Sequence, residues 1–223
     1  MAAQQPIVYE IAHPIGGCVL LLSFALLSQR RVFGVLNVFA LQALGVAAAA
    51  GWQAYAQDAP HLYITAGIAL VLKAIIVPGV LHWMIVRLGI HRAIEEALPT
   101  GATLLVGVAL VSLSILLVLP VTTAASALTR EGLAIALSIV LLGLLMMIAR
   151  RNAVSQVIGF MSLENGLVLG AVGVHGMPFV VEMSIAFSVL VAFLVFGMFF
   201  FRIRERFDTL DIDSLDRFRG ERR

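Results

Sequence analysis

The chain has 223 residues, of which 61% are hydrophobic and only 13% are charged, and its mean hydropathy is +1.03. About a quarter of the residues of a soluble domain are charged, so this composition excludes a soluble globular protein and predicts an integral membrane protein. A single cysteine cannot form a disulfide within the chain or hold an iron–sulfur cluster, so any redox chemistry must belong to partner proteins. For a membrane protein, the positions of the basic residues indicate the orientation of the chain, which the net charge of +2 does not.

Apolar stretches of membrane-spanning length follow one another along most of the chain. A transmembrane helix needs about 20 predominantly apolar residues, and proline and charged residues separate seven such stretches. They cover residues 11–28, 32–56, 62–86, 100–119, 133–149, 153–174 and 177–201. The pattern predicts an all-α membrane domain of seven transmembrane helices over residues 1–201, followed by a charged tail over residues 202–223.

The basic residues predict one orientation for these spans. Of the 15 Lys and Arg side chains, 13 lie in alternate loops and in the tail, which the positive-inside rule assigns to the cytoplasm. The N-terminus is then outside and the C-terminus is cytoplasmic. Residues 1–13 lack the basic segment of a signal peptide, so we expect the first span to be retained. The tail is either a solvated end or a docking segment for a cytoplasmic partner.

Three charged residues cannot be assigned to a loop or a terminus: Lys73, Glu164 and Glu182. An ionisable side chain in the middle of a membrane helix costs about 2.5 to 3.5 kcal/mol, so such residues face the protein interior and commonly mark ion or proton paths. Glu164 lies near the predicted midplane, and Glu182 lies nearer the outer end of the next span. Two carboxyl groups on successive helices suit a proton relay, in which a nearby Lys73 influences protonation electrostatically. Alternatively, these residues only hydrogen-bond neighbouring helices or serve as counter-ions.

The sixth predicted span has a glycine side and a carboxylate side. One arc of about 100° on this helix predicts close packing of small residues within the same chain. The residues on this arc are Asn152, Gln156, Gly159, Gly166, Gly170 and Gly173. Glu164 points about 140° away from the centre of that arc, and we therefore expect it to face a different neighbour, which could be another subunit. Na⁺ is an alternative to the proton, because Asn165 and Ser162 offer further oxygen ligands beside Glu164.

The other polar residues of the spans complete the list of candidates. Pro78 follows Lys73 and is expected to kink or open that helix, while His82 falls on the opposite side of a regular helix from Lys73. The supporting polar residues are Asn165, Gln156, Gln42 and His82. The histidines lie near the predicted membrane boundaries without the facing arrangement that haem needs, so neither a metal site nor a catalytic residue is predicted.

Several of these residues also occur in a pattern typical of a known family. The pattern comprises Arg151-Asn152, Gln156, Gly159-Phe160, Leu163-Glu164-Asn165-Gly166, Val181-Glu182, Lys73 with Val77-Pro78, and Thr209-Leu210-Asp211. The chain thereby resembles component E of hydrogenase-4, a membrane subunit found in formate-hydrogenlyase-like and other complex-I-related assemblies. Residues 141–201 are similar to the small K subunit of bacterial complex I, in which two membrane glutamates take part in proton translocation. Glu164 and Glu182 match those two positions.

The resemblance implies a subunit without redox cofactors in the plasma membrane of a bacterium or archaeon. Its partners would be antiporter-like and other membrane subunits, together with a cytoplasmic arm that carries iron–sulfur and nickel–iron or equivalent centres. Two functions follow as hypotheses. Either Glu164 and Glu182, with Lys73, contribute to proton or cation translocation coupled to electron transfer, or the subunit is purely a structural bridge between the antiporter-like subunits and the redox arm.

Overall fold

A computed structural model describes residues 12–87, 98–121, 127–151, 153–173 and 197. The chain divides into two compact units, residues 1–186 and 187–223, and all the described helices belong to the first unit. The helices are α2 (Ala12–Ser28), α3 (Val32–Ala56), α4 (Pro60–Ile68), the π-helical segment η1 (Ala69–Ile76), α5 (Val77–Arg87), α6 (Thr100–Val121), α7 (Ala127–Ala149) and α8 (Ala153–Gly173). The described part of the chain contains no extended β-strand.

The first six predicted spans coincide with these helices, and the third is one long helix made of α4, η1 and α5. The fifth begins six residues earlier than predicted, because the polar residues before Leu133 continue the helix beyond the apolar stretch. Pro60 at the first turn of α4 fits the rule that proline is tolerated where its missing N–H has no helical partner. The seventh predicted span and the tail lie outside the described residues, so the count of seven spans and the orientation stay predictions.

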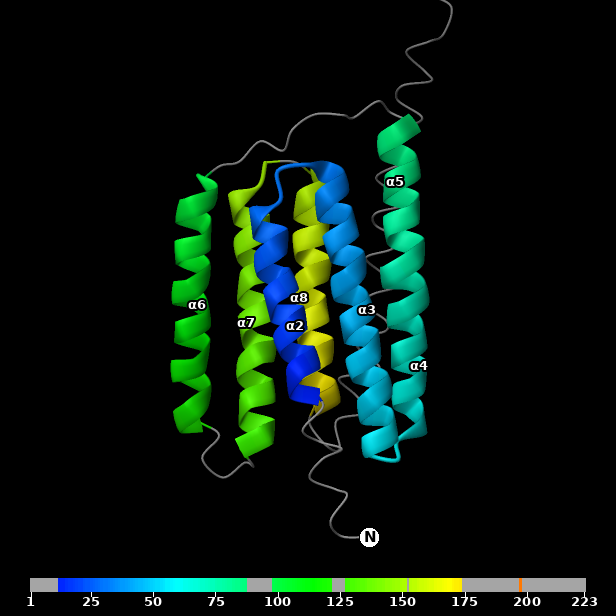
Figure 1. The fold of residues 1–223 in the computed structure, drawn as a ribbon, viewed down its shortest axis with the longest axis vertical. Coiled ribbons are helices and arrows are strands. Elements are labelled where there is room, and N and C mark those ends of the chain that lie inside the picture. The colour runs from blue at the N-terminus through cyan, green and yellow to red at the C-terminus, as the bar shows by residue number, and fades with distance from the viewer. Residues whose placement is uncertain (1–11, 88–97, 122–126, 152, 174–196, 198–223) are drawn as a thin grey trace, which may run out of the picture. The chain divides into compact units, whose positions relative to one another are not determined.

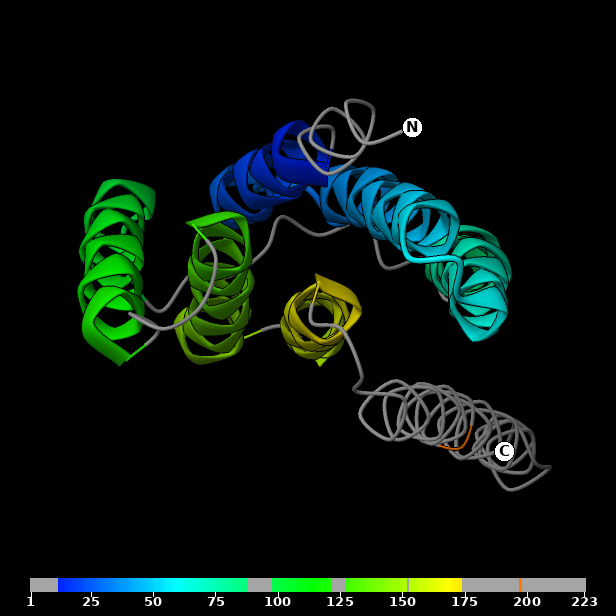
Figure 2. The same ribbon diagram turned by 90° about the horizontal axis from the view of Figure 1, so that it is seen from below.

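The helices form two layers (Figures 1 and 2). One layer contains α2, α3 and the helix α4–η1–α5, and the other contains α6, α7 and α8. Between them α2 packs on α7 and α3 packs on α8. Apolar residues of both layers make the core, among them Val19, Val46, Ile139 and Val168. This arrangement brings the middle of α8 against the layer that holds Lys73.

Glycine residues bring α7 and α8 close together, and this pair of helices makes the most extensive contact in the unit. A Cβ atom placed on Gly166 would lie 2.8 Å from the backbone nitrogen of Val140, and one on Gly159 would lie 3.1 Å from the carbonyl oxygen of Gly143. Gly170 faces Ala136 of the same helix α7. The predicted packing of the glycine side of the sixth span is therefore confirmed for Gly159, Gly166 and Gly170, where small residues allow the close approach. It is not found at Gly173, where a Cβ atom would have no neighbour within 4 Å, or at Gln156, which is exposed, and Asn152 lies outside the described residues.

Two basic turns lie at the same end of the unit (Figure 1). The turn between α7 and α8 meets the turn between α2 and α3, because the Arg150 guanidinium donates to the carbonyl oxygens of Leu27 and Gln29. Arg30 donates to Thr100 Oγ1 at the start of α6. At the opposite end, the Gln57 amide donates to the carbonyl oxygen of Val172. The basic turns thus share one end, as the predicted topology requires.

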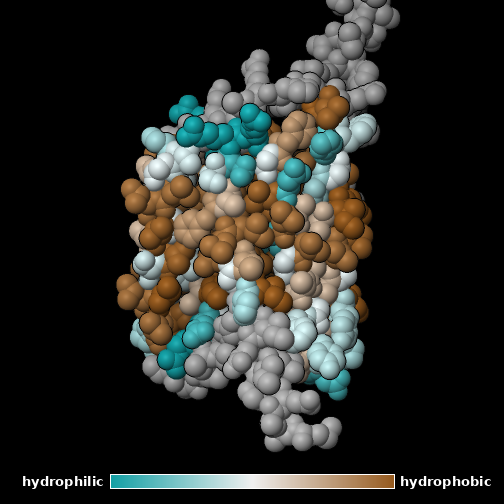
Figure 3. Space-filling model, viewed as in Figure 1, coloured by the Kyte–Doolittle hydropathy of each residue, from teal (hydrophilic) through white to brown (hydrophobic). Residues whose placement is uncertain are grey.

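Five of the described helices are long and apolar enough to cross a membrane: Val32–Ala56, Pro60–Trp83, Thr100–Pro120, Arg130–Ala149 and Val154–Gly173. Pro14–Ser28 is a shorter apolar helix. Figure 3 shows apolar residues over the middle of the visible face and hydrophilic residues gathered towards its ends. Helix α6 leaves most of its large apolar side chains exposed, which suits contact with lipid or with other membrane proteins. The chain is a multi-pass membrane protein.

Candidate functional site: a buried ion pair and its polar network

Lys73 lies on the π-helical segment of the third span. A π-helix is rare and often marks a functional site, and here it spans Ala69–Ile76, directly before Pro78. The N–H of Val77 donates to the carbonyl oxygen of Leu72, five residues back, as the wider turn requires. Proline lacks an N–H and its ring crowds the preceding turn, so a widened turn before Pro78 relieves that conflict. The opening that the sequence predicted at Pro78 takes this form.

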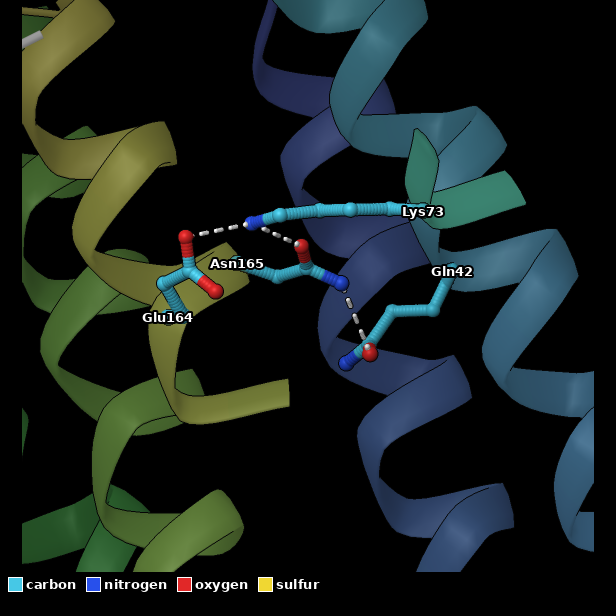
Figure 4. A network of polar contacts seen from close by, with 4 residues as sticks. All are labelled: Gln42, Lys73, Glu164 and Asn165. Atoms are coloured by element: carbon cyan, nitrogen blue, oxygen red, sulfur yellow. Dashed lines mark hydrogen bonds and ion pairs between the residues drawn. The ribbon is translucent and has the colours of Figure 1, made fainter. Parts of the chain in front are cut away.

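The widened turn keeps Lys73 on the buried side of a long helix. In a regular α-helix, which has 3.6 residues per turn, side chains spaced four residues apart move gradually around the helix surface. The wider π-helical turn offsets this rotation, so that such residues stay on one side. The buried residues of this side are Leu62, Thr65, Ala69, Lys73, Val77, Leu81 and Ile85. Lys73 is the only charged member of this set, and its side chain reaches across from η1 towards α8 (Figure 4).

Lys73 forms an ion pair with Glu164 of α8. The distance between Lys73 Nζ and Glu164 Oε1 is 3.1 Å, and the two side chains are 2% and 0% exposed. The same ammonium donates to Oδ1 of Asn165, also at 3.1 Å. Two adjacent residues of α8 therefore hold one Lys side chain, and the ammonium has both a counter-charge and a neutral hydrogen-bond acceptor.

A chain of hydrogen bonds continues from this pair into the first layer of helices (Figure 4). Asn165 Nδ2 donates to Gln42 Oε1 of α3 at 3.3 Å. Gln42 Nε2 donates to Oγ of Ser23 on α2 at 2.7 Å and to Oγ of Ser162 on α8 at 2.8 Å. All six side chains of this set, which we call the polar network, are buried: Ser23, Gln42, Lys73, Ser162, Glu164 and Asn165.

The Lys73 ammonium fixes the direction of the whole chain of bonds. An ammonium only donates, so Asn165 must turn its oxygen towards Lys73 and its NH₂ group away. That NH₂ group requires an acceptor, which orients Gln42 with its oxygen towards Asn165 and its own NH₂ group towards the two serines. The orientation of two amide groups and of the hydrogen bonds to two hydroxyl groups thus depends on one charge, as expected of a cooperative network.

Burying the two charges of the ion pair costs free energy, and removing one of the two partners costs free energy as well. Removing both charges from water costs several kcal/mol per ion, and the mutual attraction repays this cost only with good geometry and further hydrogen bonds. Such pairs are often replaceable by apolar residues without loss of stability, while removing one partner costs about 3 to 5 kcal/mol. Stability alone is therefore a weak reason for this arrangement.

The structure brings together four of the residues predicted from the sequence, namely Lys73, Glu164, Asn165 and Gln42. Gln156 lies elsewhere: its side chain is exposed and donates to the carbonyl oxygen of Arg150. His82 is also exposed and its ring lies 4.9 Å from that of Phe33. Neither takes part in the polar network. Glu182 lies outside the described residues.

The prediction that Glu164 faces a neighbour other than the helix on the glycine side is confirmed, and only the suggestion that this neighbour could be another subunit does not hold. The Glu164 side chain points away from the glycine side of α8, but it faces Lys73 of the same chain and is fully buried, not offered to another subunit. The helical period gives the direction of a side chain relative to its own helix. It cannot say which helix occupies that direction, and here η1 does.

Ser23 and Arg150 are buried polar residues that the sequence did not single out. Ser23 receives a hydrogen bond from Gln42 and donates its own hydroxyl to the carbonyl oxygen of Val19, four residues back. Nothing in the sequence separates it from other serines of apolar helices, which commonly bond in this way. Arg150 was assigned to a loop, yet it is 2% exposed and holds two main-chain carbonyl groups. Its position directly after an apolar stretch gave no sign of burial. Among the described residues, no three His, Cys, Asp or Glu side chains lie close enough to hold a metal ion.

Apolar helices of spanning length around a buried Lys–Glu pair define the class of this protein as a multi-pass α-helical membrane protein with an internal ionisable site. The chain is 30% identical over 206 residues to the uncharacterized protein Rv0085 of Mycobacterium tuberculosis, and the match covers 89% of this chain and 91% of that one. The chain belongs to the same family as that mycobacterial protein.

More distant similarity links it to hydrogenase-4 component E of Escherichia coli K12 and of Shigella flexneri. Each is 27% identical over 214 residues, which is 94% of this chain and 98% of the relative. This supports the resemblance found in the sequence as a distant relationship. No protein-family model matches the chain, and no solved structure matches it. The similarity of residues 141–201 to the complex I K subunit stays a prediction.

Proposed function

We propose that this protein is a membrane subunit, without redox cofactors of its own, of a hydrogenase-4-type complex related to complex I, and that Glu164 with Lys73 contributes to proton translocation coupled to electron transfer. The observation that carries the proposal is the buried ion pair at 3.1 Å, placed inside the helix bundle and extended by neutral hydrogen-bonding groups. The distant similarity to hydrogenase-4 component E supports the type of complex.

The proposed mechanism uses the change of charge at Glu164. A proton that reaches this carboxylate removes the attraction that holds the Lys73 ammonium, which is large inside a protein where the effective dielectric constant is about 20. Asn165 still accepts a hydrogen bond from Lys73, so the ammonium keeps one partner while Glu164 is protonated. Release of the proton restores the pair. Glu164 thus alternates between two states of different charge, and Lys73 biases it towards release.

Partners and location complete the proposal. Glu182, on the predicted seventh span, is proposed as the second carboxyl group of the relay. Antiporter-like membrane subunits and a cytoplasmic arm with iron–sulfur and nickel–iron or equivalent centres are proposed as neighbours, in the plasma membrane of a bacterium or archaeon.

Proton uptake by the reconstituted complex tests the role of Glu164. We expect Glu164→Gln, which keeps shape but loses the titratable group, to lower the number of protons moved per electron at matched electron flux. Glu131→Gln is the matched control, because Glu131 is an exposed carboxylate at the start of the long helix α7, and it should behave as wild type. An unchanged proton-to-electron ratio in Glu164→Gln would remove this residue from the path.

A purely structural role is the second candidate, and the exposed apolar side chains of α6 favour it, because they offer a broad surface to neighbouring membrane subunits. In that case Glu164→Gln leaves coupling intact, whereas deletion of residues 208–223 dissociates the complex. Co-purification of the partner subunits with the truncated chain separates the two functions.

A further inference from the structure

The polar network contains the oxygen atoms that an alkali cation would bind. Hard cations prefer carboxylate, amide and hydroxyl oxygens, and one such set is gathered here without solvent exposure. The residues that provide these oxygens are Ser23, Gln42, Ser162, Glu164 and Asn165. The types of oxygen atom in this set would therefore suit Na⁺ as well as a proton.

The directions of the hydrogen bonds distinguish the two ions. Glu164 Oε1 and Asn165 Oδ1 both point to the Lys73 ammonium, at 3.1 Å each. Gln42 Oε1 accepts from Asn165 Nδ2, and Gln42 Nε2 donates to both serine oxygens. Glu164 Oε1, Asn165 Oδ1, Gln42 Oε1 and the two serine oxygens therefore each face an N–H group. Glu164 Oε1 and Asn165 Oδ1 converge on a positive charge that is part of the chain.

Na⁺ needs several oxygens at once and would have to approach them beside that charge. It would meet repulsion from Lys73 in a buried site, where electrostatic interactions are little screened. It would also need the amide groups of Asn165 and Gln42 to turn away from their present partners, which the ammonium prevents. A proton needs only one lone pair of the Glu164 carboxylate and no coordination shell.

We infer that the Lys73 ammonium occupies the cation position of an oxygen-lined site, so that Glu164 exchanges protons and Na⁺ is excluded. This inference rests on the proposed function, since it names the ion that Glu164 handles. It also predicts an equilibrium binding property that can be measured without turnover: removing the ammonium should convert the polar network into a Na⁺ site.

Equilibrium binding of radioactive sodium to the purified full chain in detergent tests the inference. The proteins compared are wild type, Lys73→Met, Lys73→Arg, Glu164→Gln and the double variant Lys73→Met with Glu164→Gln, each checked for helical content by circular dichroism. Met matches the length of the Lys stem without its charge, and Arg keeps the charge. If Lys73→Met does not fold, Lys73→Gln replaces it, because its amide can still bond to Asn165.

We expect wild type and Lys73→Arg to show no saturable Na⁺ binding. The neutral variant should show saturable Na⁺ binding, with an affinity on the order of 1,000-fold above that of wild type, because it lacks a like charge within about 4 Å at an effective dielectric constant of about 20. The double variant should lose this binding. Saturable binding to wild type that Glu164→Gln abolishes would overturn the inference, as would a folded neutral variant that binds no Na⁺. Neither result depends on proton uptake, so failure of the proposed function in the reconstituted complex is a separate outcome.

Discussion

The contact between α7 and α8 makes a quantitative prediction about Gly143. A Cβ atom at this position would lie 2.5 Å from the backbone nitrogen of Leu163 and 2.8 Å from the carbonyl oxygen of Gly159. Both atoms belong to the backbone of the facing helix, so no side-chain rotation can relieve the contact. Gly143→Ala must therefore separate the two helices or tilt one of them.

The size of the effect follows from these distances. Ordinary van der Waals contact begins at 3.4 Å, so the helices would have to part by about 0.9 Å at this point. Overpacking of this kind costs about 1 to 3 kcal/mol. A Cβ atom on Gly132, in the same helix, would have no neighbour within 4 Å, so Gly132→Ala should gain the usual helix benefit of about 0.5 to 1 kcal/mol. Because Gly143→Ala gains the same helix benefit, the two variants should differ in free energy of unfolding by the overpacking cost, about 1 to 3 kcal/mol.

Titration with sodium dodecyl sulfate in mixed micelles, followed by far-ultraviolet circular dichroism, measures this difference. Wild type and both alanine variants are compared at one detergent composition. Because Leu163 directly precedes Glu164, Gly143→Ala should also disturb the ion pair with Lys73, whereas Gly132→Ala should not. Equal or greater stability of Gly143→Ala relative to Gly132→Ala would refute the close packing of α7 on α8.

Three further predictions use the same unfolding assay. Lys73→Met should lower the free energy of unfolding by about 3 to 5 kcal/mol, because it leaves the buried Glu164 carboxylate without its counter-charge. The added change Glu164→Met should restore most of this loss, and no restoration would mean that the two side chains do not act as a pair. Arg150→Ala should cost about 1 to 3 kcal/mol because two buried main-chain carbonyl groups lose their donor, whereas Arg151→Ala, at an exposed position, should stay within about 0.5 kcal/mol; similar losses would contradict the assigned contacts. Gln42→Leu should cost about 1 to 3 kcal/mol because it removes an acceptor and a donor from the buried network, and a neutral effect would show that these bonds contribute little.

Lys73 and Glu164 show how far the sequence leads to the site. Each stands out because a charge in an apolar stretch is costly and hence rare. Gln42 and Asn165 were correctly included as supporting residues, whereas Gln156 and His82 were included on the same grounds and lie outside the network. All four are polar residues in apolar stretches, but only Gln42 and Asn165 point into the polar network. Gln156 bonds to the main chain of Arg150, and the His82 side chain is exposed.

The sequence by itself determined the class of the protein, the approximate limits of the six described spans except for the start of the fifth, and the glycine side of α8, because each depends on local composition or on the period of one helix. Only the tertiary structure decided that Lys73 meets Glu164, that Gln42 joins α2, α3 and α8, and that Arg150 is buried between two turns. Apolar surfaces of membrane helices differ little from the lipid around them, so hydrophobicity does not choose which helices pack together. That choice depends on the shapes of small residues and on buried polar contacts, which arise between segments about 90 to 120 residues apart in the chain.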